Sequence, residues 1–147
     1  MVSLWPVRSG VLVDGDTVYF TAGIFPGERI YVRAVRASDG SPVWTNDTLS
    51  DRGASRDGFS PQGYLLASAT TLFVPTGRNL PAAIQRSDGK FLYQRGSNWR
   101  AVGLLGGTYA VLAGDQLYTG SETQVAAAPQ SSGAIGSAWF PGKRVLF

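Results

Sequence analysis

The sequence predicts an all-β fold, a partial β-propeller of about three four-stranded antiparallel blades. A strand–turn–strand pattern centred on Asp39-Gly40 recurs 49 residues later at Asp88-Gly89. Short strand-like runs fill the chain between turn residues, and the 19 glycines and 8 prolines follow no strict period. No segment of useful length shows the apolar spacing of a helix. Repeats of this length are typical of architectures in which each repeat forms one structural unit.

The first expected blade contains two hairpins. Asp14-Gly15 lies between two β-rich runs, which is among the strongest short signals for a hairpin. The run before Asp39-Gly40 alternates apolar and polar residues at period two, as a half-buried strand does. The expected strands are Val11–Val13, Thr17–Thr21, Ile30–Arg36 and Pro42–Thr45.

The second and third expected blades follow the same order in a single domain, residues 1–147, with blades at roughly 8–46, 60–96 and 103–140. The strands of the second blade are expected at Tyr64–Ala67, Thr71–Val74, Ala82–Gln85 and Phe91–Gln94. Those of the third are expected at Tyr109–Ala113, Gln116–Thr119 and Gln124–Ala127. Gln124–Ala128 could instead begin a short helix that ends at Pro129.

Composition excludes several classes of site. The chain has no cysteine and no histidine, so it has no disulfide, no imidazole base and no zinc site built on these residues. Its net charge is +3, but the arginines are scattered rather than gathered on one segment, so no nucleic-acid partner is expected. No apolar run approaches the about 20 residues of a membrane helix, and Met1–Pro6 lacks the pattern of a signal peptide.

The turn pattern resembles the tryptophan-docking motif of quinoprotein-type (PQQ-like repeat) β-propellers. The first copy matches that motif at Ala34, Gly40 and Trp44, with Asp39 in place of the motif's Thr and Arg36 in place of its first Asp. The wider sequence resembles the bacterial propellers of the outer-membrane assembly lipoprotein type. In that family the aromatic ring at the end of each fourth strand docks on the turn of the neighbouring blade.

The second copy of the motif retains Ala83, Gly89 and an aromatic residue, Tyr93, with Gln85 at the position of the Asp. The third copy is weaker and comprises Ala127, Gly133 and Ser137. Three blades cannot close a ring of the usual about 4 to 8. The chain is therefore expected to be part of a longer propeller or to associate, and Trp5–Arg8 and Val145–Phe147 resemble strands cut short at the two ends.

The resemblance implies a cofactor site only for the enzymes of this fold, which use a quinone, calcium, a catalytic Asp, a ring of adjacent cysteines and a stacking Trp. Without cysteine this ring cannot form, and we expect no catalytic, cofactor-binding or metal-binding residue. Five aspartates are expected to serve turns, where this residue bonds the local backbone: Asp14, Asp16, Asp39, Asp88 and Asp115. The long loop from Asn46 to Gly63 adds three less explained ones, Asp47, Asp51 and Asp57.

Four residues are candidates for contact with a ligand or protein partner. Gln62 and Arg78 flank the inner strands of the second blade, and loops at strand ends often carry binding. Trp99 and Arg100 lie in the segment expected to connect the second and third blades. Each can equally be an ordinary loop residue.

The sequence favours a non-catalytic PQQ-like propeller module that binds protein or acts as a scaffold, at the periplasm or surface of a bacterial cell. No cofactor and no insertion into a membrane are expected. The partner would be a protein or the remaining blades, and self-association is expected if the chain is complete. The alternative, left open, is part of a PQQ-dependent dehydrogenase whose active-site residues lie outside this chain.

Overall fold

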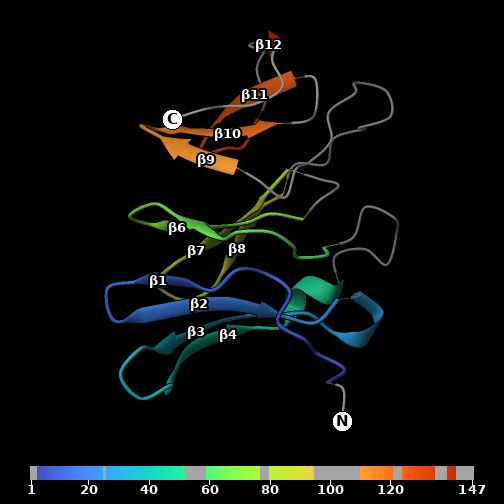
Figure 1. Ribbon diagram of the computed structural model, residues 1–147, viewed down its shortest axis with the longest axis vertical. Coiled ribbons are helices and arrows are strands. Elements are labelled where there is room, and N and C mark those ends of the chain that lie inside the picture. The colour runs from blue at the N-terminus through green and yellow to red at the C-terminus, as the bar shows by residue number, and fades with distance from the viewer. Residues whose placement is uncertain are drawn as a thin grey trace.

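The computed structural model describes residues 3–24, 26–51, 59–76, 80–94, 110–120, 124–134 and 139–141. In these residues the chain forms three antiparallel sheets of four strands each (Figure 1). Within each sheet the strands lie side by side in sequence order, so each sheet is a simple meander. The structure therefore confirms a partial propeller of three blades.

The strand bounds are as follows. The first blade contains β1 (Leu12–Asp14), β2 (Thr17–Ala22), β3 (Tyr31–Arg36) and β4 (Pro42–Asn46). The second contains β5 (Leu66–Ala67), β6 (Thr71–Val74), β7 (Ala82–Gln85) and β8 (Phe91–Tyr93). The third contains β9 (Ala110–Ala113), β10 (Gln116–Gly120), β11 (Gln124–Pro129) and β12 (Trp139–Pro141). Two short 3-10 turns, η1 (Pro26–Glu28) and η2 (Thr48–Asp51), lie beside the first blade.

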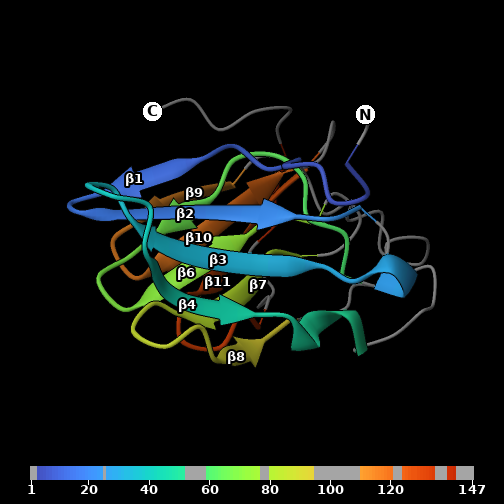
Figure 2. The same ribbon diagram turned by 90° about the horizontal axis from the view of Figure 1, so that it is seen from below.

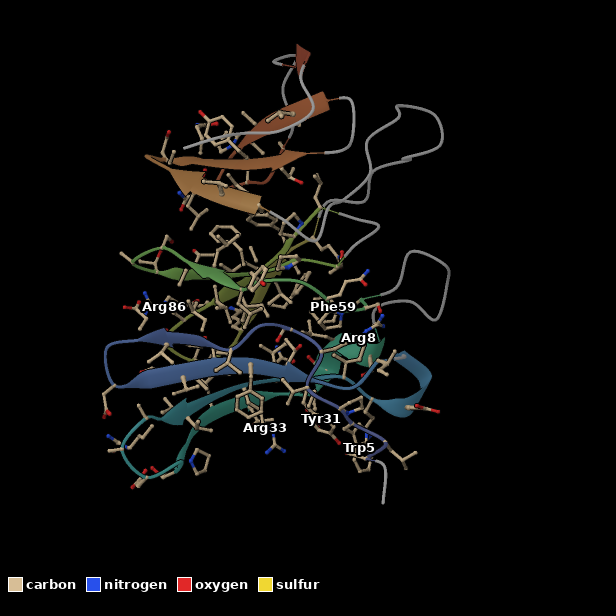
Figure 3. The ribbon with its side chains drawn as sticks, in the orientation of Figure 1. Trp5, Arg8, Tyr31, Arg33, Phe59 and Arg86 are labelled. Carbon is tan, nitrogen blue, oxygen red and sulfur yellow. The ribbon has the colours of Figure 1, made fainter. Side chains whose placement is uncertain are left out.

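The blades stack face to face, so the core lies between sheets (Figures 1 and 2). One buried cluster joins the first blade to the second; it includes Val32 and Trp44 from one sheet and Leu72 and Ile84 from the other. Side chains of this kind each contribute about 1.5–3 kcal/mol when fully buried. Phe59 closes the cluster at its loop end, between the two blades (Figure 3).

The second blade buries both of its faces. All four residues of β6 are buried, Leu72 and Val74 against the first blade and Phe73 in a second cluster with Leu117 of the third. Alternation along a strand sends successive side chains to opposite faces. A strand covered on both sides therefore needs a continuous apolar run, which Leu72–Val74 supplies.

The third blade follows one expectation and departs from another. The segment Gln124–Ala127 lies in strand β11, as expected, so the alternative of a short helix is wrong. The fourth strand does not follow the motif spacing: β12 begins at Trp139, whose Cα lies opposite that of Ala126. In the first two blades the fourth strand starts two residues after the turn glycine, but in the third it starts six residues after Gly133. Ser137, the expected docking position, lies outside the described residues.

The segment expected to be the tail of an upstream strand belongs to the first blade. Val7 pairs with Ala22 at the end of β2, and the Gly23 amide donates a hydrogen bond to the Pro6 carbonyl at 3.1 Å. The Val7–Ala22 bridge is antiparallel, as the β1–β2 pairs are, but lies two residues out of their register. The segment Val145–Phe147 lies outside the described residues. Over the described ranges, the structure contains no helix with the length and apolarity needed to span a membrane.

Candidate functional site

Trp44 joins the first blade to the second. Its indole Nε1 donates a hydrogen bond to the Arg86 carbonyl at 2.8 Å, and its ring lies over Gly89. A Cβ built at Gly89 would lie 2.8 Å from Trp44 Cδ2, which is closer than real Cβ contacts allow. Gly89 also has φ of +75°, a conformation that glycine adopts without strain. The docking role expected of Trp44 is therefore present in the structure.

Tyr93 repeats this contact between the second blade and the third. Its hydroxyl donates to the Gln130 carbonyl, and its ring lies over Gly133. A Cβ at Gly133 would lie 2.9 Å from Tyr93 Cδ2. The two contacts use equivalent atoms, a carbonyl just after the third strand and a turn glycine. We call this pairing of an aromatic residue with a turn the blade joint.

Arg86 adds a set of polar contacts to the first joint. Its guanidinium donates to the Asp14 carboxylate at 2.5 Å, to the Ser68 carbonyl at 2.6 Å and to the Tyr19 hydroxyl at 3.2 Å. The side chain is only 19% exposed. Burial disfavours its charge, but the hydrogen bond with Tyr19 and the carboxylate of Asp14 outweigh burial and raise the pKa of Arg86 above its ordinary value. Arg86 thus links two blades through contacts from both.

The turn aspartates mostly behave as expected. The Asp39 carboxylate accepts a hydrogen bond from the Ser41 amide at 2.8 Å, and Asp88 accepts one from the Lys90 amide at 2.9 Å. Hydrogen bonds from the side chain and backbone of Ser41 hold the pKa of Asp39 below its ordinary value. Asp14 differs, because its carboxylate pairs with Arg86 across the blades. None of these contacts resembles an acid–base pair poised for catalysis.

An open groove of about 520 Å³ lies beside Arg86, between the first and second blades. Its walls include Tyr19, Thr70, Gln85 and Leu92. The groove offers hydroxyls, an amide and one arginine already bonded to Asp14. Among the described residues that line it there is no carboxylate and no imidazole.

The residues described here do not fit a quinone and calcium site. No three His, Cys, Asp or Glu side chains converge on one point in the part of the chain that the structure describes. Of the long-loop aspartates, Asp47 lies 3.9 Å from Arg29, and both side chains are largely exposed. Asp57 lies outside the described residues, as does the side chain of Asp51. A calcium site would need several oxygens directed to one point.

Of the four residues expected to contact a partner, the structure describes Gln62. Its amide N–H donates to the Pro75 carbonyl at 3.0 Å, and its side-chain Nε2 donates to the Thr76 carbonyl at 3.3 Å. Gln62 therefore ties the start of the second blade to the end of β6. The other three candidates, Arg78, Trp99 and Arg100, lie outside the described residues and remain predictions.

The first blade has an apolar face that the sequence reasoning missed. Register places five residues on the side of the sheet turned away from the second blade, and we call them the outer face: Val13, Val18, Phe20, Arg33 and Val35. Val13 is 61% exposed, and Val18, Phe20 and Val35 are partly exposed. Figure 3 shows Arg33 and Tyr31 directed away from the second blade, with the Arg33 guanidinium 5.3 Å from the Tyr31 ring centre.

The strand register also shows which residues of the second blade are equivalent to those of the outer face. Val18 pairs with Val35, as Leu72 pairs with Ile84. Leu72 and Ile84 are completely buried by the first blade, whereas no described residues cover Val18 and Val35 to that extent. Aligning the second strands of the blades would have revealed this equivalence from sequence. Knowing that the described residues leave the outer face partly exposed needed the structure.

Comparisons with known proteins identify the fold. No protein-family model matches the sequence, and no curated protein matches it either. BamB from Moraxella catarrhalis is similar in structure, with a TM-score of 0.62 and 16% identity over 88% of this chain and 36% of that chain. Quinohemoprotein alcohol dehydrogenase from Comamonas testosteroni gives a TM-score of 0.63 and 15% identity over 95% of this chain and 21% of that one.

A europium-containing methanol dehydrogenase is also similar, with a TM-score of 0.61 and 19% identity over 91% of this chain and 25% of that one. The chain thus spans between 21% and 36% of the length of these three structures. Such low identities carry information about fold and not about activity. The chain has the fold of part of a quinoprotein-type β-propeller.

Proposed function

We propose that this chain is a non-catalytic propeller module that binds protein or acts as a scaffold, in the bacterial periplasm or at the cell surface. The observation that carries the proposal is the outer face of the first blade, whose apolar residues the described part of the chain leaves partly exposed. Val13 is 61% exposed beside the partly exposed Val18 and Val35. Contiguous apolar surface of this kind is typical of a site for another protein.

The polar groups between the blades support the same role. Arg86 and Asp14 bond each other, and Asp39 and Asp88 bond their own turns. In the part of the chain that the structure describes, these side chains bond one another or their own turns, which supports a structural role for them. The polar residues stabilise the contacts between blades, and apolar residues are exposed on the outer face. This arrangement is suited to binding.

The alternative is that the chain is part of a quinone-dependent dehydrogenase whose active-site residues lie outside it. The structural similarity to two dehydrogenases is the reason to test this alternative. The test is to titrate the purified 147-residue chain with the quinone and calcium ions while recording the quinone's absorbance and the reduction of an electron-accepting dye with an alcohol present. We expect no spectral shift and no dye reduction, because the described residues offer no converging ligands. A saturable spectral shift together with alcohol-dependent dye reduction would contradict the non-catalytic proposal.

A further inference from the structure

We propose that the groove beside Arg86 binds an acidic peptide segment of a protein partner, with a carboxylate on the Arg86 guanidinium and an apolar side chain against Leu92. The inference rests on the proposed protein-binding role and deepens it, because it names the chemistry of the segment that is bound. Figure 3 shows Arg86 where the first and second blades meet, so both sides of the contact belong to described blades.

Arg86 is the one charged side chain among the described residues that line the groove. Its Nη1 donates to the Ser68 carbonyl at 2.6 Å, and its Nη2 donates to the Asp14 carboxylate at 2.5 Å. Each of these nitrogens carries a second N–H, and neither second N–H has a partner among the described residues. A planar guanidinium with N–H groups to spare is well suited to binding a carboxylate.

Two hydroxyl groups in the walls of the groove add further donors. The Tyr19 hydroxyl accepts a hydrogen bond from Arg86 Nε at 3.2 Å, and the Ser87 hydroxyl accepts one from Gln85 Nε2 at 3.0 Å. Since each oxygen is the acceptor in its bond, its own hydrogen has no acceptor among the described residues. The groove therefore has donors in excess, which favours a ligand group that only accepts, such as a carboxylate.

Asp14 shows that a carboxylate from another segment can reach this guanidinium. Its side chain extends from the first blade and is 50% exposed where it pairs with Arg86. An ion pair at this level of exposure contributes little to stability. A ligand carboxylate can therefore share Arg86 with Asp14 or replace it, and Asp14 is expected to compete with the ligand.

The groove has room for more than a single carboxylate. Its volume of about 520 Å³ lies within the range of about 300–1,000 Å³ that is typical of ligand sites. Leu92 also lines it and is 43% exposed, so it offers apolar surface to a second group of the ligand. A peptide carries a carboxylate and an apolar side chain on adjacent residues, whereas inorganic phosphate supplies only the charge. These features favour an acidic peptide as the occupant.

The test is an NMR titration of the purified 147-residue chain, observed at the Nε–H of Arg86 and the backbone amide of Ser87. The probes are a terminally blocked glutamate, the matching blocked glutamine, a blocked glutamyl-leucine dipeptide and inorganic phosphate, all at one ionic strength. We expect saturable shifts with the blocked glutamate and at least ~10-fold weaker binding of the glutamine. The dipeptide should bind at least ~3-fold more tightly than the single glutamate.

Three results of this titration would overturn the proposal. The first is the absence of a shift with both glutamate probes, and the second is equal affinity for glutamate and glutamine. The third is tighter binding of phosphate than of the dipeptide, which would assign the groove to a phosphate ligand instead. None of these results involves dye reduction with the quinone, which is the outcome that overturns the proposed function itself.

A pair of matched variants tests the role of Arg86 without altering it. Asp14→Asn removes the competing carboxylate but keeps an oxygen that can accept the bond from Arg86, so it should bind the glutamate probe at least ~3-fold more tightly. Asp16→Asn removes the same charge from the same turn, at an exposed residue that does not bond Arg86, and should have a smaller effect. Equal dissociation constants for the two variants would overturn the proposal.

Leu92→Ala tests the apolar end of the groove. It should remove the advantage of the glutamyl-leucine dipeptide and leave the affinity for the single glutamate unchanged, because Leu92 faces only the second group of the ligand. A dipeptide that keeps its full advantage on Leu92→Ala would contradict the assigned contact.

Discussion

Gly89 and Trp44 show at the scale of single residues how one blade recognises the next. The turn at Gly89 requires a positive φ, and the Trp44 ring occupies the space that a side chain would need. The Trp44 indole then bonds the Arg86 carbonyl of the same turn. Shape and hydrogen bonding therefore select the same pair of residues, one from each of two neighbouring copies of the motif.

Gly89→Ala tests this joint. The new methyl group meets both backbone strain and the Trp44 ring, so we expect a loss of about 2–4 kcal/mol in the free energy of unfolding. Gly15→Ala adds the same group at a similar φ with no neighbour within 4 Å, and its cost should be about 1–2 kcal/mol. Urea unfolding followed by tryptophan fluorescence measures both. Equal losses for the two variants would mean that Trp44 does not pack on Gly89.

Arg86 is the second residue on which the contact between the first two blades depends. Arg86→Met keeps an apolar stem but removes the bonds to Asp14, Ser68 and Tyr19. We expect a loss of about 1–3 kcal/mol, because partly buried acceptors lose a charged partner. Arg36→Met, at an exposed position, should change stability by less than about 0.5 kcal/mol. If the two variants unfold at the same urea concentration, the Arg86 contacts contribute nothing.

At the scale of elements, the sequence predicts best where the local pattern and the final environment agree. Thr71–Val74 and Ala82–Gln85 are observed with the predicted bounds, since each is a short apolar run between turn residues. The hairpins at Gly15 and Gly40 also follow from Asp-Gly turns alone. Elements of this kind need no information from distant parts of the chain.

Two features of the third blade depend on more than the local pattern. The alanine-rich run of β11 has a strand conformation because β10 and β12 pair with it on both sides, which overrides the modest β-propensity of alanine. β12 starts later than the motif spacing because the connection after Gly133 is longer than in the other blades.

The candidate site was less predictable than the fold for the same reason. The partners of Arg86 come from positions 14, 19 and 68, separated from it by up to 72 residues in sequence. The outer face was recognised because the equivalent residues of the second blade are buried by the first blade. A local sequence pattern contains no information about such distant contacts. Gln62 was chosen for its place at a strand end, and its hydrogen bonds stay within its own blade.

At the scale of the whole molecule, the described residues form three blades joined by the same kind of contact. The chain spans at most 36% of the three propellers to which it is similar. The second blade packs on the first through one of its faces and on the third through the other. The central claim is that an aromatic ring docked on a turn glycine, with apolar residues packed beside it, joins one blade to the next.

Hydrogen–deuterium exchange of the wild-type chain and of Trp44→Phe tests that claim most directly. The variant keeps a ring but loses the hydrogen bond from the indole Nε1 to the Arg86 carbonyl, so we expect faster exchange in the turn at Gly89 and in β6 and β7. The turn at Gly133 serves as the internal reference and should change less, since Tyr93 holds that joint. Equal exchange of the two chains at the Gly89 turn would contradict the account.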